Sequence, residues 1–275
     1  MILLLVGIAA LFLLIERVFP ANDLPATKGW WMRIAIINVI QAGLVVLAGL
    51  TWDRWFQSAS IFSLRDHLNP IVSAAVAYVI STFVYYWWHR IRHESAFFWK
   101  LCHQLHHSPR RIEILASFYK HPVEITLNSL ISGALIYLIL GISVEAAALY
   151  TIFTAIAEYF YHWNIKTPRW LGPIFQRPES HRVHHKFAHH TQNYADLPIW
   201  DILFGTYHNP TASPKHCGFT AEREARFTDM LAFRDVHQTI GASEEKQTSL
   251  APTCLGCRKR HLCLTQRQTT IKQSS

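Results

Sequence analysis

The sequence predicts an all-α membrane protein with about four to five transmembrane or membrane-embedded helices and a helical, histidine-rich cap on the cytosolic side. Three observations predict this fold class. Of the 275 residues, 51% are hydrophobic and only 16% are charged, which is an unusually apolar balance for a soluble protein. The apolar residues are concentrated in long runs, as membrane spans require. Most of the 17 histidines, in contrast, lie between those runs.

The first two apolar runs are residues 2–15 and 34–50. No basic residue precedes the first run and no small-residue cleavage site follows it, so we expect a retained span and no cleaved signal peptide. The second run carries Asn38 and Gln41, which we expect to bond to neighbouring helices, with a substrate contact as the alternative. Residues 51–69 mix aromatic and charged side chains, as an interfacial or loop segment does.

The third span begins after Pro70 and runs directly into His89. Two further apolar runs, residues 122–140 and 142–160, are separated by Gly141 alone. They form either a hairpin of two spans or two shallower helices. In both cases the chain returns to the side that it left after the third span. The histidines before and after this pair of runs are therefore predicted to lie on one side of the membrane.

Basic residues predict which side of the membrane this is. Cytoplasmic loops carry an excess of Lys and Arg, and the histidine-bearing segments hold most of these residues, so we expect a multi-pass protein with its histidine face in the cytoplasm. The net charge of +8 is explained in the same way, and no RNA- or DNA-binding motif indicates a nucleic-acid partner. The basic residues concerned are Arg90, Arg92, Lys100, Arg110, Arg111, Lys120, Lys166, Arg169, Arg177, Arg182 and Lys186, against mainly Arg54 and Arg65 on the opposite side.

The chain divides into a membrane domain, residues 1–242, and a polar tail, residues 243–275, that we predict to be disordered. Five cysteines, three of them in the tail, do not make a disulfide framework. The tail sequence CLGCRKRHLC offers Cys254, Cys257, His261 and Cys263 to a zinc ion, although its loops are too tight for a standard zinc finger. No feature of the sequence indicates an oligomeric state.

Histidines are clustered at helical spacing in three places. His89 and His93 are four residues apart, and two further clusters have the spacing i, i+3, i+4: His103, His106 and His107, then His181, His184 and His185. Residues three and four apart share one face of a helix, so each cluster should present its imidazoles as one group. A lone histidine of this kind is usually an ordinary hydrogen-bonded residue, but three such clusters rarely arise by accident.

The chemistry of the donors indicates a transition metal. Neutral imidazole suits iron, copper, nickel and zinc, whereas calcium and magnesium prefer oxygen ligands. The histidines in the three clusters exceed the four ligands of a tetrahedral zinc site. Two metal ions, or one site of high coordination number, fit the count better.

The arrangement of these clusters resembles the fatty acid hydroxylase/sterol desaturase superfamily of integral membrane, non-haem di-iron enzymes. The matching segments are YYWWHRIRH, HQLHHS, KHPVE, YHWN, HRVHH and NYADLPIWDILFGTY, which occur in the order typical of the family over roughly residues 75–210. The stretch KFAHHTQ, between the last two segments, is shorter than the family pattern predicts and carries two further histidines. The tail beyond His237 has no counterpart in the family.

The resemblance implies O2-dependent hydroxylation or desaturation of a membrane lipid, of sterol or fatty-acyl type, at two iron ions. It also implies an external electron donor, a ferredoxin or a cytochrome with its reductase, because the chain has no flavin or nicotinamide motif. The implied metal ligands are His89, His93, His103, His106, His107, His162, His181, His184 and His185. Further candidates for a place at or around the metals are His121, His189, His190, Glu158, Asn193 and Tyr194, of which His189 and His190 lie in the stretch that departs from the family pattern.

An unactivated C–H bond has no acidic proton and no carbonyl, so its cleavage needs a strong oxidant supplied by a metal centre. Carboxylates should orient the imidazoles, and the candidates are Glu94, Glu124, Glu158, Glu179, Asp196 and Asp201. The alternatives are a metal-binding or metal-transport membrane protein and a family member without catalytic activity. A transporter would place ionisable ligands along its spans, which here carry almost none.

Overall fold

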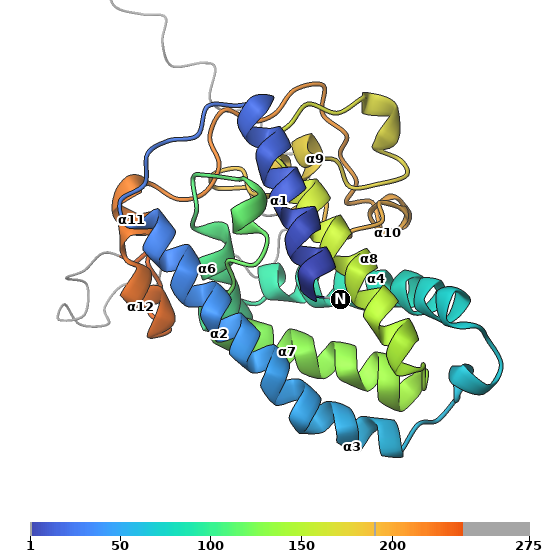
Figure 1. The fold of residues 1–275 in the computed structure, drawn as a ribbon. Coiled ribbons are helices and arrows are strands. Elements are labelled where there is room, and N and C mark those ends of the chain that lie inside the picture. The colour runs from blue at the N-terminus through green and yellow to red at the C-terminus, as the bar shows by residue number, and fades with distance from the viewer. Residues whose placement is uncertain (1, 190, 239–275) are drawn as a thin grey trace, which may run out of the picture. The chain divides into compact units, whose positions relative to one another are not determined.

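A computed structural model describes residues 2–189 and 191–238. The predicted tail, residues 243–275, and its CLGCRKRHLC segment lie outside the described residues. Within them the chain is all-helical and has no strand, apart from one antiparallel bridge between Lys186 and Cys217 (Figure 1). The all-α prediction is therefore confirmed for this part of the chain. Its longer helices are α1 (Ile2–Val18), α2 (Trp30–Leu50), α4 (Pro70–Glu94), α7 (Pro122–Gly133) and α8 (Val144–His162).

Three segments are long and apolar enough to cross a membrane: Trp30–Ser58, Pro70–Glu94 and Pro122–Ile139. The first joins α2 to α3 (Trp52–Ser58), so part of the expected interfacial segment is helical and continues the second span. The third joins α7 to the π-helix η4 (Ala134–Ile139). These three spans were predicted from hydropathy, and they indicate an integral membrane protein.

The expected count of four to five spans is too high by this measure. The first apolar run does form α1, but this helix has only 17 residues. The last run forms α8, whose 19 residues include Glu145, Glu158 and three tyrosines that lower its apolarity. Both helices exist where the sequence predicted them, and three of the five predicted runs qualify as candidate spans in the described residues.

Helices α4 and α8 pack against each other and form the centre of the bundle. Small residues line the contact, with Ala74 and Ala77 on α4 and Ala146 and Ala147 on α8, which lets the two backbones approach closely. The buried residues of α4 recur every three or four positions from Ser73 to Arg92, as expected for one face of a helix. This buried stripe ends among the histidines.

Gly141 makes the tight turn between η4 and α8. Its φ of 61° is in the left-handed region, and a side chain there would lie 2.8 Å from the backbone of Ser63. Ser143 then caps α8 by accepting a hydrogen bond from the backbone N–H of Ala146. The two runs are thus joined by one tight turn, and only the first of them, as part of Pro122–Ile139, is among the candidate spans of the described residues.

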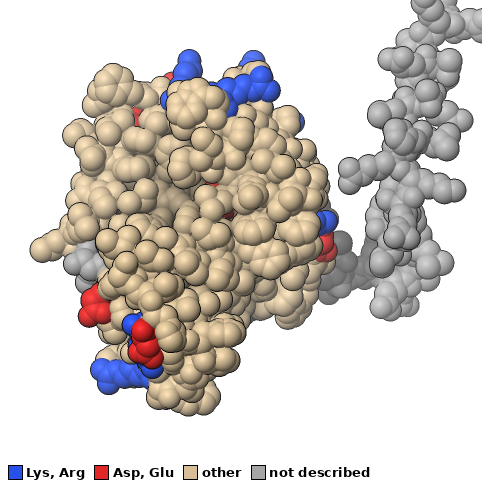
Figure 2. Space-filling model, turned by 90° about the vertical axis from the view of Figure 1, so that its right-hand side faces the viewer, with Lys and Arg blue, Asp and Glu red and all other residues tan. Residues whose placement is uncertain are grey.

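Large apolar side chains remain exposed along the spans. On α2, Val39 is 72% exposed and Val46 is 61% exposed, and on α4 Val79 is 48% exposed. On the face shown in Figure 2, Lys and Arg gather near the upper edge and at the lower left, and most of the surface between them is uncharged. A soluble protein rarely exposes so much contiguous apolar surface, whereas lipid covers it in a membrane.

The cap consists of short elements placed at one end of the bundle. They are α5 (Ala96–Phe98), the π-helix η2 (Trp99–His103), α6 (Gln104–His107), α9 (Pro178–His184), α10 (Ile199–Leu203), α11 (Ala221–Ala225) and α12 (Phe227–Leu231), with the 3₁₀ turns η3 (Ile114–Ala116) and η5 (Arg169–Leu171) in the connections. A third 3₁₀ turn, η1 (Leu64–Asp66), lies beside the turn at Gly141 and not in the cap. Buried Glu113 ties the cap to the bundle, because it accepts from the indole N–H of Trp30 at 2.8 Å and pairs with Arg17 of α1 at 2.6 Å. The cap is therefore anchored on two helices.

Gly218 and Phe219 bond the last part of the cap to the ends of two histidine-bearing segments. The N–H of Gly218 donates to the carbonyl of His185 at 2.9 Å, and the next N–H, of Phe219, donates to the carbonyl of Ser108 at 3.1 Å. A side chain at Gly218, where φ is 71°, would lie 2.2 Å from the carbonyl oxygen of Pro109. Only glycine allows this approach.

Replacement Gly218→Ala is expected to lower the free energy of unfolding by at least about 2 kcal/mol, because it adds a backbone clash to an unfavourable φ. The measurement is thermal and denaturant unfolding of the purified protein in detergent. Gly205→Ala is the matched control: Gly205 has nearly the same φ, 72°, but a side chain there would meet no atom within 4 Å. An equal loss of stability in both variants would show that the contact with Pro109 does not matter.

Candidate metal centre

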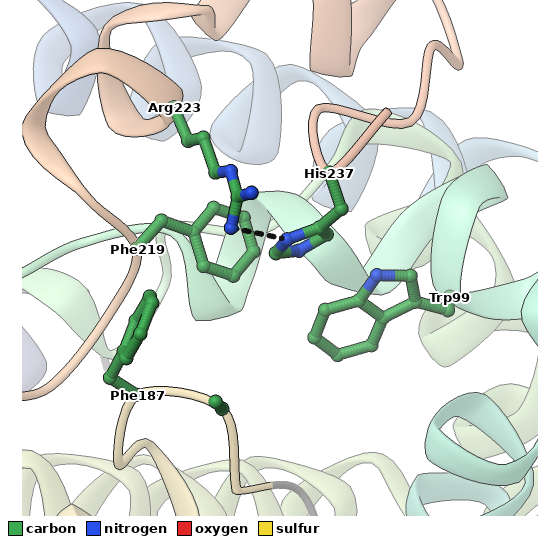
Figure 3. A pocket seen from close by; sticks show the side chains of 6 residues that line it. Trp99, Phe187, Phe219, Arg223 and His237 are labelled. Atoms are coloured by element: carbon green, nitrogen blue, oxygen red, sulfur yellow. Dashed lines mark hydrogen bonds between the residues drawn. The ribbon is translucent and has the colours of Figure 1, made fainter. Parts of the chain in front are cut away.

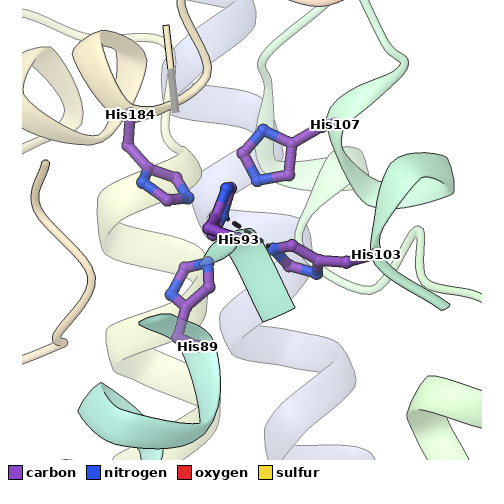
Figure 4. A group of neighbouring side chains, drawn as sticks. All are labelled: His89, His93, His103, His107 and His184. Carbon is purple, nitrogen blue, oxygen red and sulfur yellow. Dashed lines mark hydrogen bonds between the residues drawn. The ribbon is translucent and has the colours of Figure 1, made fainter. Parts of the chain in front are cut away.

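Five histidines converge at the end of α4 and form the first histidine group. His89 and His93 come from α4, His103 and His107 from η2 and α6, and His184 from the end of α9. One ring nitrogen of each lies within 4.8 Å of the others. Figure 4 shows the five rings turned toward one another from these three segments. His93 is partly buried and the other four are buried.

Four more histidines form the second histidine group, at the end of α8. They are His106 of α6, His162 at the last position of α8, His181 of α9, and His185, which caps α9. All four are buried, and one nitrogen of each again lies within 4.8 Å of the others. The two groups adjoin, because the rings of His107 and His185 stack with their centroids 4.2 Å apart.

The expectation that each cluster presents its imidazoles as one group is wrong in one respect. His103 and His107 lie in the first group, but His106 lies in the second, and His184 is likewise separated from His181 and His185. Successive helical residues are rotated by about 100°, so positions i+3 and i+4 point to opposite sides of position i. Each triplet therefore contributes to both groups, which places them side by side.

The nitrogen–nitrogen distances suit a shared metal ion. Nε2 of His93 and Nε2 of His103 are 3.0 Å apart in the first group. In the second group Nε2 of His181 lies 3.2 Å from that of His162 and 3.0 Å from that of His185. Imidazole binds metals of this kind at about 2.0–2.1 Å, so two nitrogens on one ion are about 3.0 Å apart when their bonds are at right angles.

Backbone carbonyl groups set the tautomer of two rings in the first group. Nδ1 of His89 donates to the carbonyl of Tyr194 at 2.7 Å, and Nδ1 of His184 donates to that of Gln192 at 2.8 Å. A carbonyl can only accept, so Nδ1 carries the proton and Nε2 keeps its lone pair. Nε2 of His89 is buried and has no hydrogen-bond partner among the described residues. Such a nitrogen fits a metal ligand.

The second group repeats this arrangement. Nδ1 of His162 donates to the carbonyl of Glu158 at 2.9 Å, and Nδ1 of His106 donates to that of Tyr119 at 3.3 Å. The side-chain amide of Gln176 lies 3.0 Å from Nδ1 of His181. The outer nitrogens of His162 and His106 thus donate as in the first group, whereas that of His181 faces an amide nitrogen, which can only donate to it. The Nε2 atoms of His162, His181 and His185 face one another. Either group could hold a metal ion through the inner nitrogens.

One buried carboxylate orients a ring of the first group. Glu124, near the start of α7, accepts from Nδ1 of His103 at 3.2 Å and forms a buried ion pair with Arg92. In the second group the carboxylate of Glu158 lies 3.9 Å from Nδ1 of His162 and is paired with Lys120 at 2.5 Å. Among the described residues, Glu124 and Glu158 are therefore the two candidate carboxylates that lie against histidines of the groups.

Burial and neighbouring imidazoles lower the pKa of three rings well below the usual value for histidine. These are His106, His107 and His181, for which loss of hydration is the largest cause and proximity to other histidines adds to it. The rings are therefore neutral at pH 7. Neutral imidazole is the form that binds a metal, so no proton has to be displaced from these nitrogens beforehand.

The loop that follows His185 contains Tyr194, whose backbone carbonyl accepts the hydrogen bond from His89. The carboxylate of Asp201 accepts from the backbone N–H groups of Tyr194 and Ala195 at 2.8 and 2.9 Å and from the hydroxyl of Thr206 at 2.7 Å. Asn193, with φ 57°, donates to the carbonyls of Ser180 and His208. Asn193 and Tyr194 thus belong to a hydrogen-bonded loop whose carbonyl contacts His89.

The sequence of the chain is similar to those of known proteins. The sequence model of the fatty acid hydroxylase family matches residues 74–206. The ornithine lipid hydroxylase OlsE of Rhizobium tropici is 33% identical over 250 residues, which are 82% of this chain and 72% of that protein. The chain belongs to the fatty acid hydroxylase family. All nine histidines of the two groups lie within the matched region.

Other members of the fatty acid hydroxylase family are also similar. The sphinganine C4-monooxygenase 1 of Arabidopsis thaliana is 27% identical over 180 residues, covering 63% of this chain and 68% of that protein. The methylsterol monooxygenase 2-2 of the same plant is 26% identical over 207 residues, covering 71% and 75%. No solved structure matches the chain. The resemblance seen in the motifs is thus confirmed at the level of the family.

Not every histidine predicted at or around the metals joins the two groups. Nδ1 of His121 caps α7 by accepting from the N–H of Val123, and Nε2 lies 3.3 Å from the carbonyl of Leu231, so this side chain has a structural role. Nε2 of His189 lies 3.1 Å from the amide oxygen of Gln192. His190 lies outside the described residues.

The remaining predicted carboxylates bond elsewhere. Glu94 pairs with Arg90, and Glu179 accepts from Thr167. Burial raises the pKa of Asp196 to about 7, and its hydrogen bond is to Tyr161. Sequence reasoning missed Arg92 and Gln176, which touch His103 and His181. Their only signal was a charged or polar residue eleven and five positions, respectively, from a candidate histidine, which many surface residues share.

Proposed function

We propose that this protein is an O2-dependent oxidoreductase that hydroxylates or desaturates a membrane lipid, with one iron ion held by each histidine group. The observation that carries the proposal is the pair of adjoining groups, five and four histidines, with inner nitrogens at metal-binding distances. The relatives are a lipid hydroxylase and monooxygenases of sphinganine and of a methylsterol. Together they favour a lipid as the substrate and oxidation as the reaction.

The residues present fit two iron ions. The first would be held by His89, His93, His103, His107 and His184, and the second by His106, His162, His181 and His185. When bound, the ions would supply the electrons and the oxidising power that O2 chemistry on an unactivated C–H bond requires. The rings leave room for ligands other than nitrogen, because five or four donors do not complete a six-coordinate shell.

The protein's own part is to hold and shield this centre. The backbone carbonyls and Glu124 fix the rings, and the buried positions of eight of the nine histidines keep bulk water away. Because the site lies at the ends of α4 and α8, a lipid in the bilayer would reach it from the membrane side. The basic residues of the cap predict that this end faces the cytoplasm.

Electrons would come from a separate protein, a ferredoxin or a cytochrome with its reductase, because the chain has no flavin or nicotinamide motif. We also retain the division into a membrane domain, residues 1–242, and a tail. The alternative is a protein that only binds or transports metal. Seven of the nine histidines lie outside the candidate spans, and His89 and His93 lie in the last turns of the span Pro70–Glu94, at its cap end, which favours the enzyme.

The test is to purify the full chain anaerobically in detergent, measure its metal content, and supply a reductase chain, isotopically labelled O2 and a membrane lipid extract. We expect about two irons per chain, because each group offers enough nitrogen donors for one ion. Mass spectrometry should show a lipid that has gained one labelled oxygen or lost two hydrogens. Protein that carries a single zinc or no metal, and yields no such product, would exclude the proposed enzyme.

A further inference from the structure

A cavity of about 260 Å³ lies beside the first histidine group. It is lined by Trp99, Phe187, Ala188, Phe219, Arg223 and His237 (Figure 3). Trp99 forms the wall that the cavity shares with the histidines, since its ring centroid is 5.5 Å from that of His93 and 5.4 Å from that of His107. A molecule in this cavity is therefore separated from the first group by one aromatic ring.

The polar groups of the cavity are hydrogen-bond donors. The guanidinium of Arg223 donates to Nδ1 of His237 at 3.3 Å, so the proton of the neutral imidazole is on Nε2. No carboxylate of the described residues forms an ion pair with Arg223, whereas Arg226 and Arg234, on either side of α12, both pair with Asp229. Glu222 and Glu224 flank Arg223 in the chain, and Glu224 is paired with Arg110. Asp235, two residues before His237, accepts from the backbone N–H of His237.

The other walls are apolar. Phe219 is buried and its ring centroid lies 4.5 Å from that of His237, while Phe187 is 40% exposed at the opposite wall. Aromatic walls around a guanidinium suit a molecule that joins an anionic group to a hydrocarbon chain. The volume is below the range of about 300–1,000 Å³ that holds a whole drug-sized ligand, so the cavity would take only one end of a lipid.

The position of the cavity agrees with an amphiphilic ligand. Helix α12, which lies between Arg223 and His237 in the chain, packs on the cap ends of two spans: Arg33 of α2 lies over the ring of Phe227, and Phe233 contacts His121 at the start of α7. Trp99 follows the end of α4 by five residues. The ends of spans are where lipid headgroups meet water.

We propose that this cavity binds the anionic end of a lipid, a carboxylate or phosphate held by Arg223 and Nε2 of His237, with the adjoining hydrocarbon against Trp99 and Phe219. The inference rests on the proposed function in one respect, because it identifies this lipid as the substrate of the oxidation. The anionic end of the lipid is then held next to the first histidine group. The substrate class is then an anionic or zwitterionic amphiphile and not a neutral sterol.

Binding is tested with α-bromo-octanoate, whose bromine quenches a nearby indole, on the full-length protein as purified in neutral detergent. Saturable quenching is expected in the parent protein and not in Trp99→Phe. Arg223→Gln should lower the affinity about tenfold or more, through loss of a charge-assisted hydrogen bond, and Arg223→Lys should lower it much less. Arg234→Gln, which alters an exposed arginine outside the cavity, is the matched control and should bind normally.

Other outcomes would overturn the proposal. Unchanged affinity in Arg223→Gln, quenching that persists in Trp99→Phe, or equal binding of neutral α-bromo-octanamide would each exclude an anion site at Arg223. Acetate and inorganic phosphate should compete far more weakly than octanoate or octyl phosphate. If they compete equally well, the cavity recognises a free anion and not the end of a lipid.

Enzyme kinetics test, separately from binding, whether the lipid in the cavity is also the substrate. Where the protein oxidises an anionic lipid, Arg223→Gln should raise KM for that lipid and leave kcat close to that of the parent protein. Oxidation with an unchanged KM would refute the substrate assignment and leave the proposed enzyme intact. Binding at Arg223 without oxidation of any lipid would instead count against the proposed function.

Discussion

Replacement of one histidine in each group should remove the metals separately. We expect His89→Ala, in the first group, and His162→Ala, in the second, each to retain about one iron per chain, and the double variant to retain almost none, because each replacement removes an inner nitrogen donor from one site only. Lipid oxidation should fall to background in both single variants, since the proposed reaction uses both ions. The measurements are metal analysis and product formation on protein purified without oxygen.

His189→Ala is the matched control, because its ring is in neither group and lies against the amide of Gln192. This variant should keep both metals and its activity. Loss of both metals in each single variant would mean that the nine histidines form one cooperative site. Full metal content in His89→Ala would show that the first group is not a metal site.

Replacement Glu124→Ala should have the second large effect, on both stability and metal affinity. It leaves the buried guanidinium of Arg92 without its carboxylate, and breaking a buried ion pair from one side typically costs about 3–5 kcal/mol. It also removes the acceptor for Nδ1 of His103, and loss of such a partner typically weakens metal binding about 10–100-fold. Unfolding in detergent and competition with a chelator measure the two effects.

A double variant distinguishes orientation of His103 from simple structural support. Arg92→Met combined with Glu124→Leu removes both charges while keeping similar volumes, an exchange that is often close to neutral for stability. The double variant should therefore regain most of the unfolding free energy lost in Glu124→Ala. Its metal affinity should remain low, because His103 still has no carboxylate. Recovery of metal affinity together with stability would show that Glu124 acts only through the fold.

Much of the candidate site could be predicted from sequence because it depends on local spacing. His103, His106 and His107 are close in the chain, and any helical conformation brings their rings near one another. Hydropathy predicted the long-range agreement: the apolar runs 122–140 and 142–160 were expected to return the chain to the side it left, which places the clusters around His89 and His181 at one end of the helices. His121, in KHPVE, was expected at or around the metals, and its ring caps α7.

The sequence by itself determined the helical class, the places of the apolar helices and the nine histidines that converge, because apolar runs and residue spacing are written directly along the chain. It overestimated the number of spans. Only the tertiary structure decided that the triplets divide between two groups, that Glu124 and Arg92 meet His103, and that Trp99 separates a cavity from the histidines. Those contacts join segments far apart in the chain. Their geometry depends on how α4, α7, α8 and the cap pack, which no local pattern specifies.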